Sequence, residues 1–254
     1  MSVISNSSGS FCKSCIVSGS CIGNSDSCSA NIVNRSHRVY QPGSSLFMAG
    51  DKFEGVYILH SGSAKSYVAN AGGDEQVIGF HFPGDLLGID GFDTQTYGYS
   101  LEFLETSSVC CIALQDLNML LDESAEFRKR LLKAMSHVIV DEHFLLLSLG
   151  KLKSEQRMAK FLLDLSHRFG HRKLSSHIFY LSMTRSDIAN YLGMAIETIS
   201  RLLTKFHDLG LIDVQRRKIT LLDTAGLQAY LDGNELGARW FSKSIFDLDS
   251  AVSQ

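Results

Sequence analysis

The spacing of the apolar residues changes near residue 122 of this 254-residue chain, and that change constrains the fold more than any single motif. From residue 33 to 121, short alternating runs such as Gly55-Val-Tyr-Ile-Leu and Gln76-Val-Ile-Gly-Phe are separated by Gly and Asp. Short runs separated by these turn residues are typical of antiparallel hairpins. They predict a small β-barrel or roll.

From residue 124 to 149 the apolar residues follow a helical repeat instead. One row steps by 4, 3, 4, 3 and 4 residues: Leu131, Met135, Val138, Glu142, Leu145 and Leu149. A flanking row recurs at intervals of seven: Leu132, Ile139 and Leu146. A stripe this wide can pack on the chain's own β-domain, but a repeat of almost three heptads favours the seam of a two-helix dimer.

The residues after 154 predict a winged helix-turn-helix. A helix over 154–169 and a strand over 178–181 precede two short helices, 185–192 and 195–209, with Gly193 in the turn between them. Thr184 and Asp187 form a T-x-x-D capping signature for the first short helix. The segments 212–214 and 218–221 can pair as a small β-wing. The residues after 226 have weak patterning and are expected to be peripheral.

Charge is distributed unevenly along the chain. Residues 1–127 carry 5 lysines and arginines against 14 acids, whereas residues 128–254 carry 19 against 13. The basic C-terminal half suits a polyanion such as double-stranded DNA, although a basic solvated face would give the same count. No apolar stretch approaches the roughly 20 residues of a membrane span, and the N-terminus has no secretion signal. We therefore expect a cytoplasmic protein without a membrane partner.

In a chain that is not exported, the six cysteines are expected to be thiols or metal ligands rather than disulfides. Three of them follow a C-x2-C-x5-C spacing near the N-terminus: Cys12, Cys15 and Cys21. On spacing alone this set fits a zinc site, a redox thiol pair or an iron–sulfur cluster. A fourth ligand could be Cys28, which would make all four ligands N-terminal, or Cys110 in the β-rich part. Cys111 is expected to point to the opposite face of its strand.

Several motifs carry a resemblance to a known family. The β-rich part contains Pro42-Gly43-x-x-Leu46-x-x-x-Gly50-Asp51, Gly73-Asp74-Glu75-Gln76 and Gly79-Phe80-His81. The C-terminal part contains Met183-Thr184-Arg185-Ser186-Asp187-Ile188, Asn190-Tyr191-Leu192-Gly193 and Glu197-Thr198-Ile199-Ser200-Arg201. In this order, from Cys12 to about Leu222, the chain resembles the FNR branch (fumarate and nitrate reduction regulators) of the cyclic-AMP receptor protein superfamily.

The resemblance implies a redox-labile cofactor. FNR-like proteins hold a 4Fe–4S cluster with three N-terminal cysteines and one in the β-domain, which match Cys12, Cys15, Cys21 and Cys110 here. Oxygen attack on the cluster makes their dimer dissociate. Ser20 stands where the well-known family member has a bulky apolar residue, so we predict an altered oxygen sensitivity, in either direction. Cluster decay in air, compared between the native chain and Ser20→Leu, would test this prediction.

The same resemblance gives the dimer seam a role as a switch. In a two-fold dimer Glu142 would face or neighbour its own copy, and like charges near an interface oppose association. A position at a solvated edge is the alternative. We hypothesise that Glu142 and Asp141 keep the cluster-free chain monomeric. Cluster binding would repack Ile139 and its neighbours to overcome this repulsion.

The second short helix of the helix-turn-helix is expected to lie in the major groove. Glu197, Ser200 and Arg201 share one helical face and match the family's base-reading positions, where they can meet cytosine, thymine and guanine. Ile196 stands where the cyclic-AMP receptor has an arginine, which favours a palindrome of TTGAT-type half-sites. The candidate phosphate contacts are Arg185, Lys205, Arg216, Arg217 and Lys218.

Two other function classes are disfavoured. A cyclic nucleotide would need a cation for its phosphate, and residues 84–109 contain neither Arg nor Lys, so no cyclic nucleotide is expected. No nucleophile elbow, P-loop or His-Glu-x-x-His motif is present, so we do not expect an enzyme. An iron–sulfur electron carrier would not need a helix-turn-helix.

The sequence thus predicts an α+β chain in five parts. They are a Cys-rich cluster arm (1–30), a β-roll sensor domain (31–123), a dimerisation helix (124–150), a winged helix-turn-helix (151–225) and a C-terminal extension (226–254). The resemblance implies an oxygen-responsive transcription regulator that binds promoters as a homodimer under low oxygen. It also implies contact with RNA polymerase, through Gly73-Asp74 and the Thr106 region. The alternative is a regulator of the same superfamily that responds, without an iron–sulfur cluster, to another ligand or redox signal.

Overall fold

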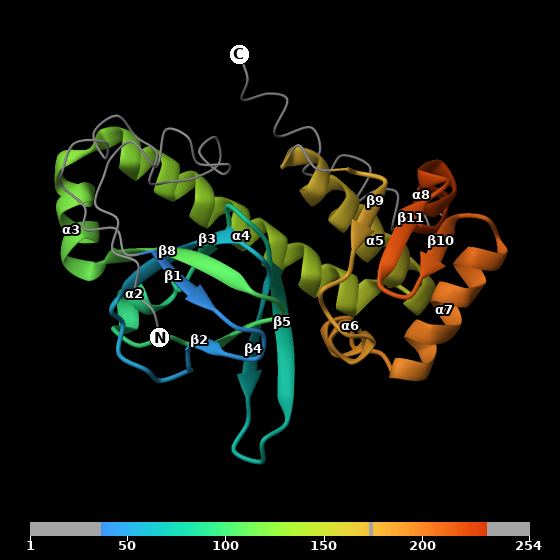
Figure 1. The fold of residues 1–254 in the computed structure, drawn as a ribbon, viewed down its shortest axis with the longest axis horizontal. Helices are drawn as coiled ribbons and strands as arrows, with labels where there is room; N and C mark the ends of the chain where they lie inside the picture. The colour runs from blue at the N-terminus through green and yellow to red at the C-terminus, as the bar shows by residue number, and fades with distance from the viewer. Residues whose placement is uncertain (1–36, 173–174, 233–254) are drawn as a thin grey trace. The chain divides into compact units, whose positions relative to one another are not determined.

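The computed structural model describes residues 37–172 and 175–232 (Figure 1). They belong to two compact units that divide between Asp141 and Glu142. The N-terminal cysteines and Ser20 lie outside the described residues: Cys12, Cys15, Cys21 and Cys28. Their predicted roles therefore stay predictions.

The first unit is built on two antiparallel four-stranded sheets. One sheet has the order β1 (His37–Tyr40), β8 (Ser107–Ala113), β3 (Gly55–Ser61) and β6 (Leu86–Leu87). The other has the order β2 (Ser45–Phe47), β7 (Ser100–Phe103), β4 (Ala64–Ala69) and β5 (Glu75–His81). The short helix α2 (Gly91–Thr94) follows β6 in the chain. The predicted β-roll is confirmed.

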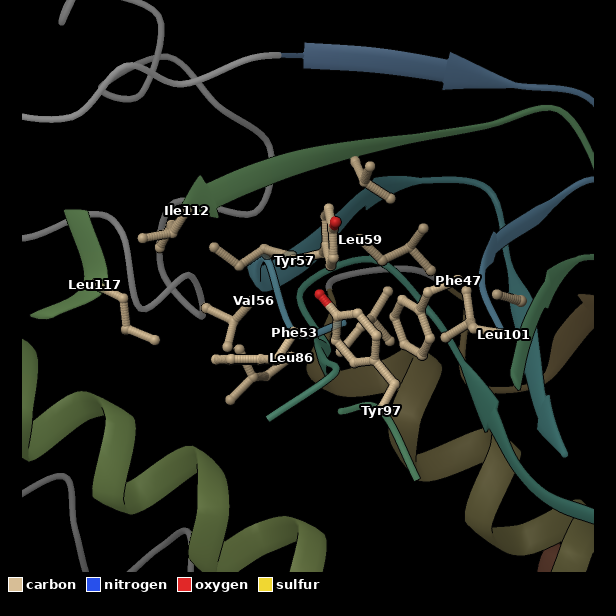
Figure 2. Close-up of a cluster of buried hydrophobic side chains, with 14 of the residues drawn as sticks. Phe47, Phe53, Val56, Tyr57, Leu59, Leu86, Tyr97, Leu101, Ile112 and Leu117 are labelled. Carbon is tan, nitrogen blue, oxygen red and sulfur yellow. The ribbon is translucent and has the colours of Figure 1, made fainter. Parts of the chain in front are cut away.

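Aromatic side chains fill much of the core of this roll (Figure 2). The rings of Phe47 and Tyr97 stack with their centroids 4.0 Å apart, and Phe53 packs edge-on against Tyr97. The Tyr97 hydroxyl donates to the carbonyl oxygen of Gly55 at 2.9 Å, so the polar end of this ring is satisfied inside the core. Desolvation raises the pKa of the neighbouring Tyr57 far above its usual range.

Strand β8 leads into α3 (Leu114–Glu123) and then α4 (Ala125–Lys151). Ser124 separates the two helices, and its hydroxyl accepts from the Phe127 amide at 3.1 Å, as a cap does at a helix start. Phe127 and Leu117 are fully buried in the roll's core. Both helices are therefore tied to the β-roll where they begin.

The two apolar rows of α4 have different surroundings. Leu131 is 5% exposed, and Met135 packs against the same core. The flanking row, in contrast, is exposed by 65% at Leu132, 49% at Ile139 and 68% at Leu146. Our assignment of Leu131 to a dimer seam was wrong, because the chain's own β-domain covers that side of the helix. The apolar side chains of α4 left to solvent are the flanking row and, at the end of the first row, Leu149.

The second unit has the predicted winged helix-turn-helix. Its elements are α5 (Ser154–His171), β9 (Ile178–Tyr180), α6 (Arg185–Tyr191), α7 (Ile196–Asp208), β10 (Ile212–Gln215), β11 (Lys218–Leu221) and α8 (Thr224–Asp232). The strands form an antiparallel sheet of order β10-β11-β9. None of the described helices combines the length and the apolar character that crossing a membrane requires.

The helix α8 belongs to this second unit. Leu227 and Leu231 are buried, and the buried Gln156 side chain donates to the Leu231 carbonyl oxygen at 3.3 Å. The boundary that we placed at residue 225 falls inside this unit, and the residues up to 232 are not peripheral. Two leucines four residues apart give a helix this short too little periodicity to be recognised in the sequence.

Candidate DNA-reading face and cysteine strand

The first helix of the motif, α6, begins with the capping box that the sequence predicts. The Asp187 amide donates to the Thr184 hydroxyl at 3.1 Å, and the Thr184 amide donates to the Asp187 carboxylate at 2.9 Å. Both backbone donors at the helix start are thereby satisfied. Ile188 and Ala189 are buried, so the helix is fixed at its start and along its inner face.

The second helix, α7, separates its residues into a buried row and an exposed row. The buried row fixes the helix in the unit: Ile199, Leu202, Leu203 and Phe206. Glu197 and Arg201 are exposed and Ser200 is half-buried, so the three candidate base-reading residues share the side away from the core. Ile196, at the first position of the helix, is 43% exposed.

Two of the candidate DNA contacts meet across the motif. The Arg185 Nη1 at the start of α6 donates to the Ser200 hydroxyl on α7 at 3.1 Å. Arg201 Nη2 donates to the Thr198 hydroxyl at 3.3 Å. A groove of about 520 Å³ lies along this side of α7, lined by Ser200, Arg201, Thr204, Lys205, Asp208 and Leu209. The arrangement offers guanidinium and hydroxyl donors to an anionic partner.

Lys205 forms an ion pair with Glu155, which the sequence did not indicate. Its Nζ lies 2.7 Å from a carboxylate oxygen of Glu155 in the first turn of α5, and this hydrogen bond raises the pKa of Lys205. Glu155 and Lys205 are 50 residues apart, so no local spacing indicates the pair. A phosphate contact by Lys205 would have to compete with this carboxylate.

The wing carries the other candidate phosphate contacts at its tip. Arg216 and Arg217 form the turn between β10 and β11, because Gln215 pairs with Lys218. Arg216 has a φ of 59°, in the left-handed region that non-glycine residues rarely adopt. Both arginines are exposed.

In the first unit, strand β8 places Cys110 between two neighbouring strands. Cys110 pairs with Ile58 of β3 on one side and with His37 of β1 on the other. In the sequence, His37 follows Cys21 by 16 residues. The Cys110 side chain is half-buried, and no disulfide joins it to Cys111.

Cys111 has different surroundings from its neighbour. It pairs with Tyr57, and successive strand residues point to opposite faces. Burial raises the pKa of the Cys111 thiol, an effect that the nearby Arg38 partly offsets. Within residues 37–172 and 175–232, no group of three or more His, Cys, Asp and Glu side chains is arranged to hold a metal ion.

Polar side chains lie on β8 and on its neighbour β3. The hydroxyls of Ser61 and Ser108 are 2.6 Å apart, and His60 Nδ1 lies 3.2 Å from the Ser108 hydroxyl. Close to the ends of these strands, Ser63 donates to the Glu105 carboxylate at 2.7 Å. No sequence signal indicated these residues, because serines in strands have no distinctive spacing.

Comparisons with known proteins agree on the architecture. Residues 37–124 match a cyclic nucleotide-binding domain, and residues 156–230 match a Crp-like helix-turn-helix domain. The chain resembles solved structures of FixK2 from Bradyrhizobium japonicum (TM-score 0.72, 24% identity, 77% of this chain and 96% of that one) and of a CooA mutant from Carboxydothermus hydrogenoformans (TM-score 0.67, 17% identity, 82% and 93%). At these identities the likeness concerns the fold alone.

Curated relatives are more similar in sequence. The transcriptional activator protein FnrA of Stutzerimonas stutzeri is 37% identical over 226 residues, which cover 87% of this chain and 93% of the relative. The transcriptional activator protein anr of Pseudomonas aeruginosa is 38% identical with the same coverage. The fumarate and nitrate reduction regulatory protein of Yersinia pestis is 40% identical over 80% of this chain and 81% of the relative.

Proposed function

Because the chain belongs to the FNR-type transcription regulators of the cyclic-AMP receptor protein superfamily, we propose that it is an oxygen-responsive regulator controlled by a 4Fe–4S cluster. Regulators of this family bind DNA and typically act as dimers, and the chain is a regulator rather than an enzyme. The proposed ligands are Cys12, Cys15, Cys21 and Cys110. Since its relatives are named activators, we extend the proposal to promoter activation.

The single observation that supports this ligand set is the pairing of His37 with Cys110. Cys21 precedes His37 by 16 residues in the sequence, so the intervening chain is long enough for the four sulfurs to come together. Cys28 is the rival fourth ligand. Four thiolates complete the shell of a 4Fe–4S cluster, which supplies a redox-labile centre when bound. The chain's own contribution is to hold Cys110 on a strand fixed on both sides.

The pairing of two chains is proposed to occur along the exposed row of α4. Leu132, Ile139 and Leu146 recur every seven residues, which places them on one helical face. Glu142 is exposed and lies between Ile139 and Leu146 on that face. It can therefore oppose pairing, as can Asp141, until the cluster-loaded state makes the apolar contacts outweigh the repulsion.

DNA reading is proposed to use α7. Glu197, Ser200 and Arg201 would contact a TTGAT-type half-site, while Arg185 and Lys205 would contact phosphates. The wing residues Arg216, Arg217 and Lys218 would add further phosphate contacts. RNA polymerase would contact the Gly73-Asp74 turn and Thr106. The turn between β4 and β5 is closed by Asn70, whose amide donates to the Asp74 carbonyl oxygen at 3.0 Å, and Thr106 is exposed.

Binding of a cyclic nucleotide is not part of the proposal, although residues 37–124 match such a domain. The roll's core is packed with the chain's own aromatic rings, including Phe47, Tyr57 and Tyr97. Lys65 is 9% exposed and lies 3.7 Å from the Glu102 carboxylate, so this cation already has an anionic partner. A buried nucleotide phosphate would need a cation of its own.

The test is a visible spectrum of anaerobically purified protein, with iron and sulfide analysis, repeated after exposure to air. We expect a brown protein with about four irons per chain, whose colour fades in air. A colourless, iron-free protein that binds the palindrome equally well in both conditions would favour the alternative, a regulator of the same superfamily that responds to another signal.

A further inference from the structure

Arg157, in the first turn of α5, holds the turn of the helix-turn-helix. Its Nη1 donates to the carbonyl oxygen of Leu192 at 2.6 Å and to that of Gly193 at 3.4 Å. Leu192 caps the end of α6, and Gly193 follows it in the left-handed region with a φ of 60°. Carbonyls at a helix end lack partners within the helix and carry the negative end of its dipole, so a guanidinium there is both bonded and attracted.

The contact of Arg157 with the turn leaves one buried donor unbonded among the described residues, which lowers the stability of the folded state. The Nε of Arg157 is buried and has no hydrogen-bond partner within the described part of the chain. Desolvation by burial lowers the pKa of Arg157. A buried donor without a partner destabilises the folded state. The side chain is therefore placed so that Nη1 bonds both carbonyls of the turn, while Nε, within the described structure, is left without a partner.

Leu149, near the end of α4, approaches the same turn. A Cβ atom added to Gly193 would lie 3.4 Å from Arg157 Nη1 and 3.4 Å from Leu149 Cδ2. Leu149 is 37% exposed and lies three residues beyond Leu146 of the exposed row, on the same side of the helix. The turn is thus bounded by a residue of α5 and by the last part of the proposed dimer face.

Helix α7, the helix proposed to read DNA, depends on this turn for its position. It begins at Ile196, four residues after Leu192, and its N-cap residue Ala195 makes no side-chain hydrogen bond to the helix. A helix start without a cap is not fixed locally, so the connection from α6 and the buried row determine where Arg201 points.

We propose that Arg157 and Leu149 form a clamp on the Leu192–Gly193 turn, which sets the orientation of α7 and transmits a change in α4 to the DNA-reading face. The inference rests on the proposed DNA-binding function and deepens it. In this proposal Arg157 is a positioning residue, which acts through its contacts with the turn and not through a contact with DNA. Leu149 is the clamp residue that would change its contact with the turn when α4 pairs with a second chain.

The first experiment measures affinity for a TTGAT palindrome and for a scrambled duplex at several salt concentrations, with the anaerobically purified full chain. Arg157→Met should weaken binding to the palindrome on the order of tenfold, while the salt slope and the scrambled-duplex affinity stay unchanged. Arg157→Lys should recover part of the loss. Lys160→Met removes a cation from the same helix, where Lys160 pairs with Asp164, and should bind like the native chain.

Two results of this experiment would overturn the clamp. One is native palindrome affinity in Arg157→Met. The other is equal weakening on both duplexes with a salt slope reduced by about 0.9, since that is the signature of a lost phosphate contact. If Arg157→Met does not fold, Gly193→Ala provides the second test, because its methyl group would lie between the two clamp residues. It should also lose palindrome affinity selectively, and native affinity would again overturn the clamp.

The second experiment is a double-mutant cycle with Leu149→Ala. If both residues act on one turn, the double variant should bind the palindrome no more than about twofold more weakly than Arg157→Met alone. Fully additive losses would show two independent effects and refute the clamp. If the native chain binds no palindrome, the proposed function itself fails, a result distinct from a native chain that binds and variants that bind equally well.

Discussion

The reading helix α7 and the cysteine strand β8 are built in opposite ways. Helix α7 contains both its anchor and its candidate DNA-reading face: Phe206 and its row are buried, while Glu197 and Arg201 are exposed on the other side. Strand β8 contributes one candidate ligand, Cys110, and the other proposed ligands lie far away in the sequence. A reading face can thus be made by one segment, whereas a cluster site has to be assembled from several.

The largest effect that tests this comparison concerns neighbouring cysteines on β8. Cys110→Ser should lose most of the iron and the visible absorbance of the anaerobic protein, because a hydroxyl replaces one of four thiolates. Cys111→Ser should keep both, since Cys111 points to the opposite face of the strand. Iron and sulfide analysis of the two variants measures this. Equal iron loss, or retention in both, would contradict the assignment of Cys110.

A second prediction tests whether the two regions are independent. Phe206→Ala should lower the free energy of unfolding of the C-terminal unit by about 3–5 kcal/mol, because Phe206 is fully buried. Thr204→Ala, at an exposed position of the same helix, should change it by no more than about 0.5 kcal/mol. Denaturation followed by fluorescence and by cluster absorbance measures both regions. Simultaneous loss of the cluster in Phe206→Ala would show that the two regions do not act separately.

A third prediction separates residues within the reading region. Arg201→Ala should weaken binding to the cognate palindrome by about 1–3 kcal/mol and relax the preference at one base pair. Arg216→Ala, at the wing tip, should weaken binding to all duplexes alike and reduce the salt slope by about 1. Titrations with cognate and single-base-changed duplexes distinguish the two. The proposed roles would be exchanged if Arg201→Ala changed only the salt slope.

The smallest expected effect concerns the helix that both units share. Glu142→Ala should strengthen pairing of the cluster-free chain by about 1 kcal/mol, because it removes like charges from the exposed row of α4. Glu126→Ala is the matched control, since Glu126 already pairs with Arg130 on the same helix. Sedimentation equilibrium measures both variants. If Glu142→Ala stays as monomeric as the control, the charge switch is refuted.

The sequence predicted the winged helix-turn-helix fold better than it predicted which apolar row of α4 is exposed, and the reason is physical. The capping of α6 by Thr184 and Asp187 depends on residues three apart, so the local pattern is sufficient. Leu131 and Leu132 are adjacent in the sequence, and only the tertiary packing shows that the β-roll buries the first and leaves the second exposed. The contact of Arg157 with the turn joins segments 35 residues apart, which no periodicity reveals.

If the proposed cluster controls the pairing of two chains, sedimentation velocity of the anaerobic protein measures that control most directly. Absorbance of the cluster and of the polypeptide would be recorded in the same cell, before and after air is admitted. We expect the coloured species to sediment as a dimer and the bleached species to sediment as a monomer. A dimer of unchanged sedimentation coefficient after complete bleaching would contradict this expectation.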